Sequence, residues 1–453
     1  MPETTPVTSG AVIAAAIFAG VLAPLNSTMI VVALPEVLAD LGASLTWGSW
    51  IVVSYLVAMA AIQPLGGSLG DRFGRRRLLL LGLAGFGVAS LVAAVAPSVE
   101  VLVAARTAQA VTGASAIPNA TALVRTLVPT AIRGRAFGLI GAGIGVAAAI
   151  GPPLGGLVTG AYGWRWIFAL NLLVLVPAMV LAARVGDGRQ ATRAGRFDLV
   201  GSGLLLTALV GFALAATLWR VPGVPWPAVV ALALVAAAAA WGLRRHVARV
   251  AAPVVDLRLL GRPGFLAAGG SILFSNLTMY TILLAVPVFL AQLVGWGARD
   301  VGLLLSGMSL LMLVFGPVGG WLADRTGRRA PALAGTLIAM LGAAPLVLVS
   351  TSWAWPAYLV PLMVVGTGIG LAGAPVQAAA MEAAGVDEAG QAAGLFSTMR
   401  YVGSILGAAG MAAILGSAAG EGAFRVLFAL LVLAAGAAAA ASSRLPRGVE
   451  PMG

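Results

Sequence analysis

Long stretches without a charged residue follow one another along almost the whole chain. A helix needs roughly 20 apolar residues to cross a bilayer, so each stretch predicts a membrane-spanning helix. They cover residues 4–35, 41–70, 78–99, 136–164, 166–183, 199–219, 221–243, 263–298, 301–323, 330–381 and 426–443.

Three further features complete the helix count. The stretch 330–381 is long enough for two helices, and the segment Thr351-Ser352-Trp353-Ala354-Trp355-Pro356 interrupts it near its middle. Two more apolar stretches each contain one arginine, and they are 101–124 with Arg106 and 389–420 with Arg400. The pattern therefore predicts an all-α integral membrane protein with fourteen transmembrane helices.

Composition agrees with this fold class and excludes several others. Hydrophobic residues make up 60% of the chain and charged residues 9%, with a mean hydropathy of +1.02. There is no cysteine, so disulfides and thiolate metal sites are excluded. No cluster of acids, histidines or nucleophiles falls within the spans, so we expect neither an enzyme nor a bound metal or cofactor. The single histidine, His246, is interpreted as a solvated residue among arginines.

The basic residues, all arginine, fix the orientation. With the N-terminus in the cytoplasm, 21 arginines fall on the cytoplasmic side and four on the other, namely Arg165, Arg220, Arg299 and Arg425. Loops on the cytoplasmic side of membrane proteins carry such an excess. The net charge of +12 is thereby explained without nucleic acid. We expect a multi-pass protein of the inner (plasma) membrane with both termini in the cytoplasm.

An internal repeat indicates two halves. The segment 66–77 recurs 253 residues later as 319–330, with eight of twelve positions identical. Both copies fall at the cytoplasmic end of a helix, and eight crossings separate them, so the halves have parallel orientation. Two six-helix bundles need six crossings between equivalent points. The helices at 199–219 and 221–243 are therefore additional.

The predicted domains follow from this count. They are an N-terminal six-helix bundle at 1–190, two additional helices with a linker at 191–262, and a C-terminal six-helix bundle at 263–453. In the repeat, glycines let helices approach closely while the aspartate and arginines bridge helix ends. The predicted inner gate consists of Gly67, Asp71, Arg72, Gly74, Arg75 and Arg76, with Asp324 and Arg325 in the second copy.

Several segments together resemble the major facilitator superfamily, in its drug:proton antiporter branch with fourteen spans. The resemblance runs from about residue 20 to 415. It rests on the inner-loop signature Gly67–Arg76, the helix 1 segment Thr28–Pro35, Arg106-Thr107-Ala108-Gln109 running on to Pro118, Gly151-Pro152-Pro153-Leu154-Gly155-Gly156, Gly163–Phe168 and Arg196–Gly201.

The resemblance implies a function. A member of this branch is a secondary active exporter of small amphipathic molecules, such as antibiotics, drugs or secondary metabolites, and works by proton antiport with alternating access. It also implies a monomer in the lipid bilayer. Gly151, Pro152, Gly155 and Gly156 form the helix 5 motif of exporters, which would bend that helix and pack it tightly against a partner.

The departures from the branch bear on cargo and coupling. Asn26 stands where the branch usually carries an aspartate, and Ala110 and Thr112 replace helix 4 glycines. Arg106 and Arg400 are the charges within apolar stretches, and an intramembrane ion is costly unless it is solvated or paired, so both are candidates for function. With no acid placed at similar depth, the cavity would be positive, which favours neutral or anionic cargo. The alternative is that backbone carbonyls and Gln109 satisfy both arginines, which never meet cargo.

Polar residues within the predicted membrane spans are the candidates for lining a cargo cavity. Each is equally consistent with a hydrogen bond between helices. The candidates are Asn26, Thr28, Gln63, Arg106, Gln109, Asn119, Asn276, Tyr280, Gln292, Gln377 and Arg400.

Three modes of coupling stay open. Asp71 and Glu36 are the candidate proton carriers, because Asn26 cannot titrate. The cargo could instead carry the proton as a weak acid, or the carrier could be uncoupled. An alternative function within the same fold is a lipid or metabolite carrier without proton coupling.

Overall fold

The computed structural model describes residues 9–186, 198–219, 224–250, 253, 255–384, 388–415 and 420–447. Within these ranges the chain forms helices and no strand. Two members of the predicted inner gate, Gly67 and the side chain of Asp71, lie outside the described part. The fold class expected from the charge-free stretches is confirmed.

Seven helices make up the first half of the described chain. They are α1 (Ser9–Asp40), α2 (Leu45–Phe73), α3 (Arg75–Ala94), α4 (Val99–Gly113), α5 (Ala116–Leu127), α6 (Thr130–Tyr162) and α7 (Trp166–Arg184). The additional pair follows as α8 (Leu199–Leu218) and α9 (Trp226–Val247).

The described residues of the second half form six long helices and three short ones. They are η1 (Leu257–Gly261), α10 (Pro263–Phe289), η2 (Leu290–Val294), α11 (Ala298–Thr326), α12 (Arg329–Ala343), η3 (Ala344–Leu348), α13 (Trp355–Ala384), α14 (Ala389–Leu415) and α15 (Glu421–Ser442).

Thirteen helices of the described part are long and apolar enough to cross a membrane. The fourteenth predicted crossing is divided into α4 and α5 at Ala114 and Ser115. Pro118 lies in the first turn of α5 and has no N–H to donate to the carbonyl of Ala114. The Ser115 hydroxyl donates to the Thr112 carbonyl at 2.9 Å, which satisfies one acceptor at the break. The α4–α5 pair thus accounts for the one predicted crossing that is not a single long helix.

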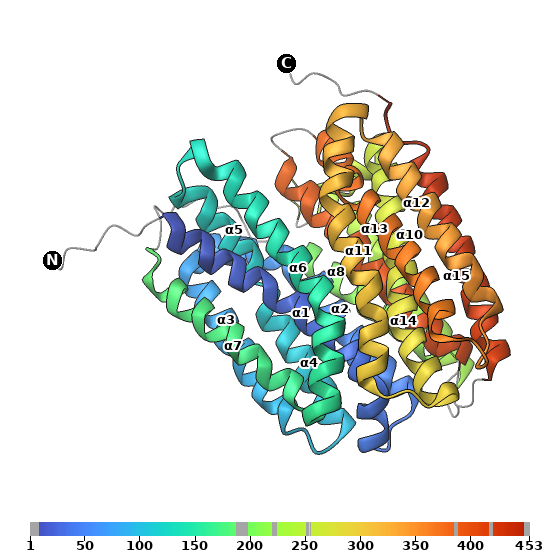
Figure 1. The fold of residues 1–453 in the computed structure, drawn as a ribbon. Coiled ribbons are helices and arrows are strands. Elements are labelled where there is room, and N and C mark those ends of the chain that lie inside the picture. Colours follow the sequence, from blue (N-terminus) through green and yellow to red (C-terminus); the bar gives the residue numbers. More distant parts are fainter. Residues whose placement is uncertain are drawn as a thin grey trace.

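The helices form two groups that follow the chain order. In Figure 1, α1–α7 in blue to green lie on one side and α10–α15 in yellow to red on the other. Within the first group α1 packs against α6 and α7, and within the second α10 packs against α14 and α15. Between the groups, α6 packs against α11, α2 against α14, and α1 against α10. We call these groups the N-bundle and the C-bundle.

The repeat has the same local geometry in both bundles. Gly74 separates α2 from α3 with φ +97°, and Gly327 separates α11 from α12 with φ +83°. A side chain would strain this left-handed backbone, whereas glycine adopts it freely. The repeated glycine is therefore required by the sharp connection between consecutive helices.

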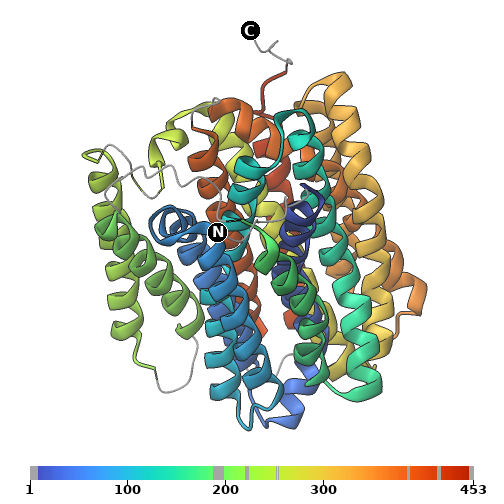
Figure 2. The same ribbon diagram turned by 90° about the vertical axis from the view of Figure 1, so that its left-hand side faces the viewer.

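The additional pair lies beside the bundles. Figure 2 shows α8 and α9, in green, at one edge of the molecule. They pack mainly on each other, and α8 also contacts α2 and α14, one from each bundle. At one end of the pair, His246 Nε2 lies 2.6 Å from Asp198 Oδ1. The interpretation of His246 as a solvated residue was wrong, because the N-cap aspartate of α8 engages its ring.

Two faces of the molecule are used below. The arginine-rich face lies at the helix ends marked by Arg72, Arg184 and Arg328, and the opposite face at those marked by Asp40 and Trp164. On the opposite side, a Cβ placed on Gly156 of α6 would lie 2.6 Å from the Ala298 carbonyl oxygen and 2.7 Å from Gly302 Cα. The bundles are therefore in backbone contact near that face.

Candidate functional site

A network of buried polar side chains lies inside the N-bundle. Asn26 Nδ2 of α1 donates to Gln109 Oε1 of α4 at 3.3 Å, and Arg106 Nη1 donates to the same oxygen at 3.1 Å. All three side chains are fully buried. Gln109 Oε1 therefore joins Asn26 of α1 to Arg106 of α4 as their shared acceptor.

Two residues from other helices extend this network. Gln109 Nε2 donates to Ser90 Oγ of α3 at 2.7 Å, and Asn171 Nδ2 of α7 donates to Asn26 Oδ1 at 3.2 Å. Ser90 and Asn171 are also fully buried. The network thus connects α1, α3, α4 and α7, and its members are neutral apart from Arg106.

Arg106 is the member of the network whose charge and hydrogen-bond donors are not fully paired. Its guanidinium carbon lies 4.2 Å from the ring centre of Tyr55 and 6.0 Å from that of Phe168. Its Nε and Nη2 atoms are buried and have no hydrogen-bond partner in the described part of the chain. No carboxylate within the described ranges forms an ion pair with it. Aromatic faces compensate a buried cation only partly, so Arg106 retains unused capacity for an anionic or acceptor group.

Tyrosines connect this network to the C-bundle. Tyr55 of α2 lies near Tyr280 of α10 and Tyr401 of α14. Arg400, next to Tyr401, is partly exposed and donates to Ser397 Oγ at 3.3 Å. Both intramembrane arginines therefore lie near the boundary between the bundles, one buried in the N-bundle and one partly exposed on the C-bundle.

The helix 5 motif packs against helix 1. A Cβ on Gly151 would overlap Thr28 Oγ1, and one on Gly155 would lie 2.8 Å from Met29 Cα. Thr28 itself donates to the Pro24 carbonyl at 2.8 Å within its own helix. The helix α6 continues through Pro152 and Pro153 without interruption. The glycines of this motif thus permit contact between α6 and α1, and Gly156 permits contact with α11.

Asn119 occupies a contact between helices of the N-bundle. Its Nδ2 donates to the Gly66 carbonyl of α2 and to the Ser115 carbonyl, both at 2.8 Å. A Cβ on Gly70 would overlap the Asn119 side chain. In this conformation Asn119 therefore holds α5 against α2.

The other polar candidates are dispersed. Gln63 is partly buried and its Oε1 lacks a partner among the described residues, whereas Asn276 is buried and donates to the Ile272 carbonyl of its own helix at 3.0 Å. Gln292 and Gln377 are exposed and lie toward opposite faces of the molecule. The structure does not bring these four residues together with the buried network.

Arginines of the predicted inner gate bind backbone carbonyls of neighbouring helices within the N-bundle. Arg75 Nη1 donates to the Ala122 carbonyl of α5 at 3.3 Å, and Arg76 Nε donates to the Ala182 carbonyl at the end of α7 at 3.4 Å. Arg72 is exposed beside the Phe73 ring. Cations at helix C-termini also interact favourably with the helix dipole. Arg75 and Arg76 thus fasten three helices at the arginine-rich face.

The second copy of the motif makes the equivalent connection with acids. Arg328 pairs with Asp324 at 2.7 Å and with Glu382, at the end of α13, also at 2.7 Å. Arg325 lies over the Trp321 ring at 4.1 Å. As Arg75 joins the start of α3 to α5, Arg328 joins the start of α12 to α13.

Acids at the end of helix 1 are held by the turn between α6 and α7. Glu36 Oε1 accepts from the Trp164 backbone N–H at 3.1 Å, and Asp40 accepts from Trp164 Nε1 at 3.0 Å. Asp40 also pairs with Arg165 at 2.6 Å. Asp40 is thereby neutralised, whereas Glu36 has no cation partner within the described ranges.

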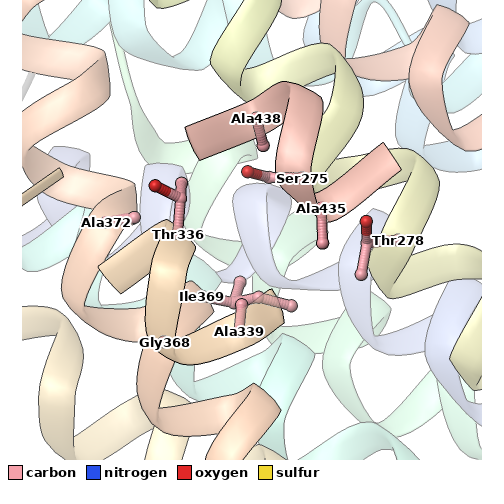
Figure 3. A pocket seen from close by; sticks show the side chains of 9 residues that line it. All are labelled: Ser275, Thr278, Thr336, Ala339, Gly368, Ile369, Ala372, Ala435 and Ala438. Carbon is pink, nitrogen blue, oxygen red and sulfur yellow. The ribbon is translucent and has the colours of Figure 1, made fainter. Parts of the chain in front are cut away.

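A small cavity inside the C-bundle is too narrow for cargo. Figure 3 shows Ser275, Thr278 and Thr336 around it, with Gly368 and Ala435 among the other lining residues. Its volume of about 10 Å³ corresponds to roughly one water molecule. We therefore assign it no role in holding cargo.

Several participants have no strong sequence signal. Ser90, Asn171, Tyr55 and Tyr401 are part of the network or its boundary, but neutral polar residues in a span read as ordinary helix contacts. The spacing of Arg106 and Gln109, one helical turn apart, was the available signal. Within the described ranges, no three of the side chains that commonly ligate metals gather at one place.

Comparison with known proteins supports the assignment of this fold. The chain is 32% identical to the MFS-type transporter YvkA of Bacillus subtilis over 93% of this chain and 94% of the relative. It is 32% identical to the multidrug resistance protein Stp of Mycobacterium tuberculosis, covering 86% and 73%. The puromycin resistance protein pur8 of Streptomyces alboniger is 33% identical, covering 86% and 78%.

The family model described as Major Facilitator Superfamily matches residues 16–408. This range includes both copies of the repeated motif, the buried network and the additional pair of helices. The chain therefore belongs to the Major Facilitator Superfamily, whose members are membrane transporters and not enzymes.

Proposed function

We propose that this transporter is a secondary active exporter of small amphipathic molecules that works by alternating access in the plasma membrane. The excess of arginine on one face supports placing that face, and both termini, in the cytoplasm. The relatives named for multidrug and puromycin resistance support export as the direction of transport. The bundles, here divided at 1–190 and 263–453, would rock about the cargo as a monomer.

The observation that carries this proposal is the unequal approach of α6 and α11 along their length. Near the opposite face, Gly156 and Gly302 are in backbone contact, and a Cβ on Gly160 would lie 3.1 Å from Arg299 Cβ. Toward the arginine-rich face, Gly145 of α6 and Gly316 of α11 would have nothing within 4 Å of an added Cβ. This asymmetry supports a state closed to the outside, in which an exporter loads its cargo from the cytoplasm.

The chemistry of the boundary between the bundles supports neutral or anionic cargo. Arg106 has two unused donors, and Arg400 is partly exposed nearby. A lipophilic cation would be repelled by both and would find no carboxylate there among the described residues. Once movement of the bundles exposes Arg106, an anionic or acceptor group of the cargo would accept hydrogen bonds from its unused Nε and Nη2 atoms. Tyr55 and Tyr280 would supply apolar contact with a polar end.

Proton coupling belongs to the same proposal. Asn26 cannot carry the proton, and Glu36 lies at the outer end of α1 rather than in the buried network. A carboxylate carrier at a helix end, Asp71 or Glu36, ranks first. A cargo that binds as a weak acid ranks second, and a carrier without coupling ranks third. The second mode agrees with the charge of Arg106, because an anion could bind and leave with a proton.

Cargo accumulation in cells that lack their own efflux pumps tests the proposal. Cells expressing the transporter would be loaded with fluorescent amphiphiles of matched size that are anionic, neutral or cationic, and puromycin would be included. We expect lower intracellular levels of anionic or neutral compounds, restored by a protonophore. Equal retention of every compound with and without the transporter would contradict export. Lower levels that the protonophore leaves unchanged would contradict proton coupling alone.

A further inference from the structure

A second cavity lies between the bundles at the opposite face. Its volume is about 500 Å³, and it is lined by α1 of the N-bundle and by η2 and α11 of the C-bundle. Small-molecule sites in proteins typically enclose roughly 300–1,000 Å³. This cavity is therefore large enough for a small organic molecule, unlike the cavity inside the C-bundle.

Its lining is apolar with one charge. Most of the lining is aliphatic, including Val32, Leu38 and Val301, and Gln292 adds an amide. Among the described residues that line it, Glu36 alone is charged. A carboxylate in a concave and mostly apolar wall is suited to an amphipathic cation, because the ion is attracted while its apolar body is removed from water.

Glu36 is fixed in place but incompletely used. Its Oε1 accepts from the Trp164 N–H at 3.1 Å, while a carboxylate offers about four acceptor positions over two oxygens. In the described part of the chain Oε2 has no hydrogen-bond partner, and no cation pairs with Glu36. The neighbouring acid Asp40 is already paired with Arg165. The negative charge available to a ligand is therefore that of Glu36.

An aromatic side chain contributes to the facing wall. The π-helical turn η2 ends at Val294, and the next residue, Gly295, reverses the chain with a φ of +83°. The Trp296 N–H then donates to the Leu290 carbonyl at 2.9 Å. Trp296 lines the cavity, and its ring packs edge-on against Tyr358 at 5.6 Å. Such π-turns are frequent at functional sites, and a tryptophan face attracts organic cations.

We propose that this cavity is a binding site for an amphipathic organic cation, held by the Glu36 carboxylate and Trp296. The site is separate from the Arg106 network and does not depend on the direction of transport. Because its walls come from both bundles, an occupant stabilises the conformation in which they meet at this face. In the proposed orientation the site is reached from outside the cell.

Equilibrium binding to the purified transporter in detergent tests the site without requiring transport. The probe is tetraphenylphosphonium, and tetraphenylborate, which has the same shape and the opposite charge, controls for partition into the micelle. We expect one saturable site for the cation, and binding of the anion, the charge class proposed for the Arg106 network, should not change in Glu36→Gln. Glu36→Gln keeps an acceptor for Trp164 and should raise the dissociation constant for the cation at least about tenfold, equivalent to about 1.4 kcal/mol.

Two further variants separate binding from folding and from general surface charge. Ala39→Phe fills the cavity, leaves Glu36 intact and should also weaken binding. Glu100→Gln removes an exposed charge in the first turn of α4, outside the cavity, and should bind the cation as the native protein does. Equal affinity of the native protein and both cavity variants would overturn the proposal, as would a loss of tetraphenylborate binding in Glu36→Gln that matches the loss of cation binding. Loss of binding in Glu100→Gln as well would overturn the assignment to Glu36.

Discussion

At the scale of single residues, Arg106 is the most costly feature of the N-bundle. It is fully buried, and no acid pairs with it in the described part of the chain. An ionised side chain within a membrane costs several kcal/mol unless it is solvated or paired. The aromatic ring of Tyr55 and the Gln109 oxygen offset part of that cost. Because its burial is energetically unfavourable, Arg106 is expected to serve the function of the protein rather than its stability.

Replacing Arg106 with leucine should separate the two roles. Exchanging a buried ion for a hydrophobic residue is often neutral or stabilising by about 1–4 kcal/mol, so Arg106→Leu should keep or raise the thermal unfolding midpoint. Export of anionic compounds should fall at least about tenfold, as expected when a charge partner is removed. Unfolding monitored by tryptophan fluorescence and efflux assays measure both. A lower midpoint with unchanged export would make Arg106 structural.

A carboxylate at position 26 should introduce a new titration. The Asn26 side chain and the Arg106 guanidinium share Gln109 Oε1, so an aspartate at 26 would lie close to an unpaired cation. If coupling operates through this network, Asn26→Asp changes the pH dependence of transport in reconstituted vesicles, while Asn26→Ser adds no titrating group. Identical pH profiles for the native protein and both variants would place position 26 outside the coupling site.

Sequence reasoning at this scale identified Asn26, Arg106 and Gln109 as candidates but not Ser90 and Asn171. An arginine within an apolar stretch stands out, and Gln109 one turn later is readily linked to it. Ser90 and Asn171 join the network through α3 and α7. Their spacing along the chain carries no such information, because three-dimensional packing decides which faces of separate helices meet. The same limit applies to Asn119, whose partner is a backbone carbonyl of α2.

At the scale of helices, the contact between α6 and α11 decides which face is closed. Glycine at 156 and 302 lets the two backbones touch. Helices in membranes gain their association mainly from close packing of small residues. The closure near this face is thus encoded in two helix surfaces rather than in a loop.

A side chain at position 156 should open this closure. Gly156→Val would place a Cβ 2.6 Å from the Ala298 carbonyl oxygen, and overpacking costs about 1–3 kcal/mol. The population should shift by about tenfold for each 1.4 kcal/mol toward the state open at this face. Labelling of an introduced cysteine at position 299 by a membrane-impermeant reagent would report the shift.

The matched control is Gly145→Val on the same helix, because a Cβ there meets nothing within 4 Å. It should label as the native background does. Equal labelling of Gly156→Val and the control would show that the contact does not maintain closure.

Substitutions in the predicted inner gate test closure at the arginine-rich face. Arg75 and Arg76 bind backbone carbonyls of α5 and α7 in this conformation, and we expect Asp71 to act when the cytoplasmic side closes. Asp71→Asn should therefore lower export while membrane levels stay normal, with Asp324→Asn as the comparison in the second copy. Unchanged export at equal expression would reduce the motif to a signal for topology.

Helix positions were largely predictable, and one helix break was not. Charge-free stretches gave twelve crossings and two stretches with a single arginine gave the others, because the bilayer requires long apolar segments. The division of the fourth crossing into α4 and α5 depends on Pro118, which the apolar pattern treats as part of a continuous span. Pro152 and Pro153, by contrast, leave α6 helical. Proline effects depend on whether neighbouring helices satisfy the freed carbonyls.

At the scale of the whole molecule, the account depends on orientation. An even number of crossings and an arginine-rich face predict that both termini lie in the cytoplasm. A fluorescent protein that matures only in the cytoplasm, fused after Gly453, should be fluorescent, and alkaline phosphatase at the same position should be inactive. The reverse result would contradict the helix count.

The central claim is that the two bundles close alternately at opposite faces, and distances between spin labels test it most directly. The native chain has no cysteine, so labels can be placed at 160 and 299 across the closed contact and at 145 and 316 across the separated helix segments. Without a gradient, we expect short distances for the first pair and long ones for the second. Acidification on the outer side of reconstituted vesicles, with cargo inside, should populate the reverse pattern, the first pair lengthening as the second shortens. Distance distributions that stay fixed under every condition, or that lengthen together, would contradict alternating access.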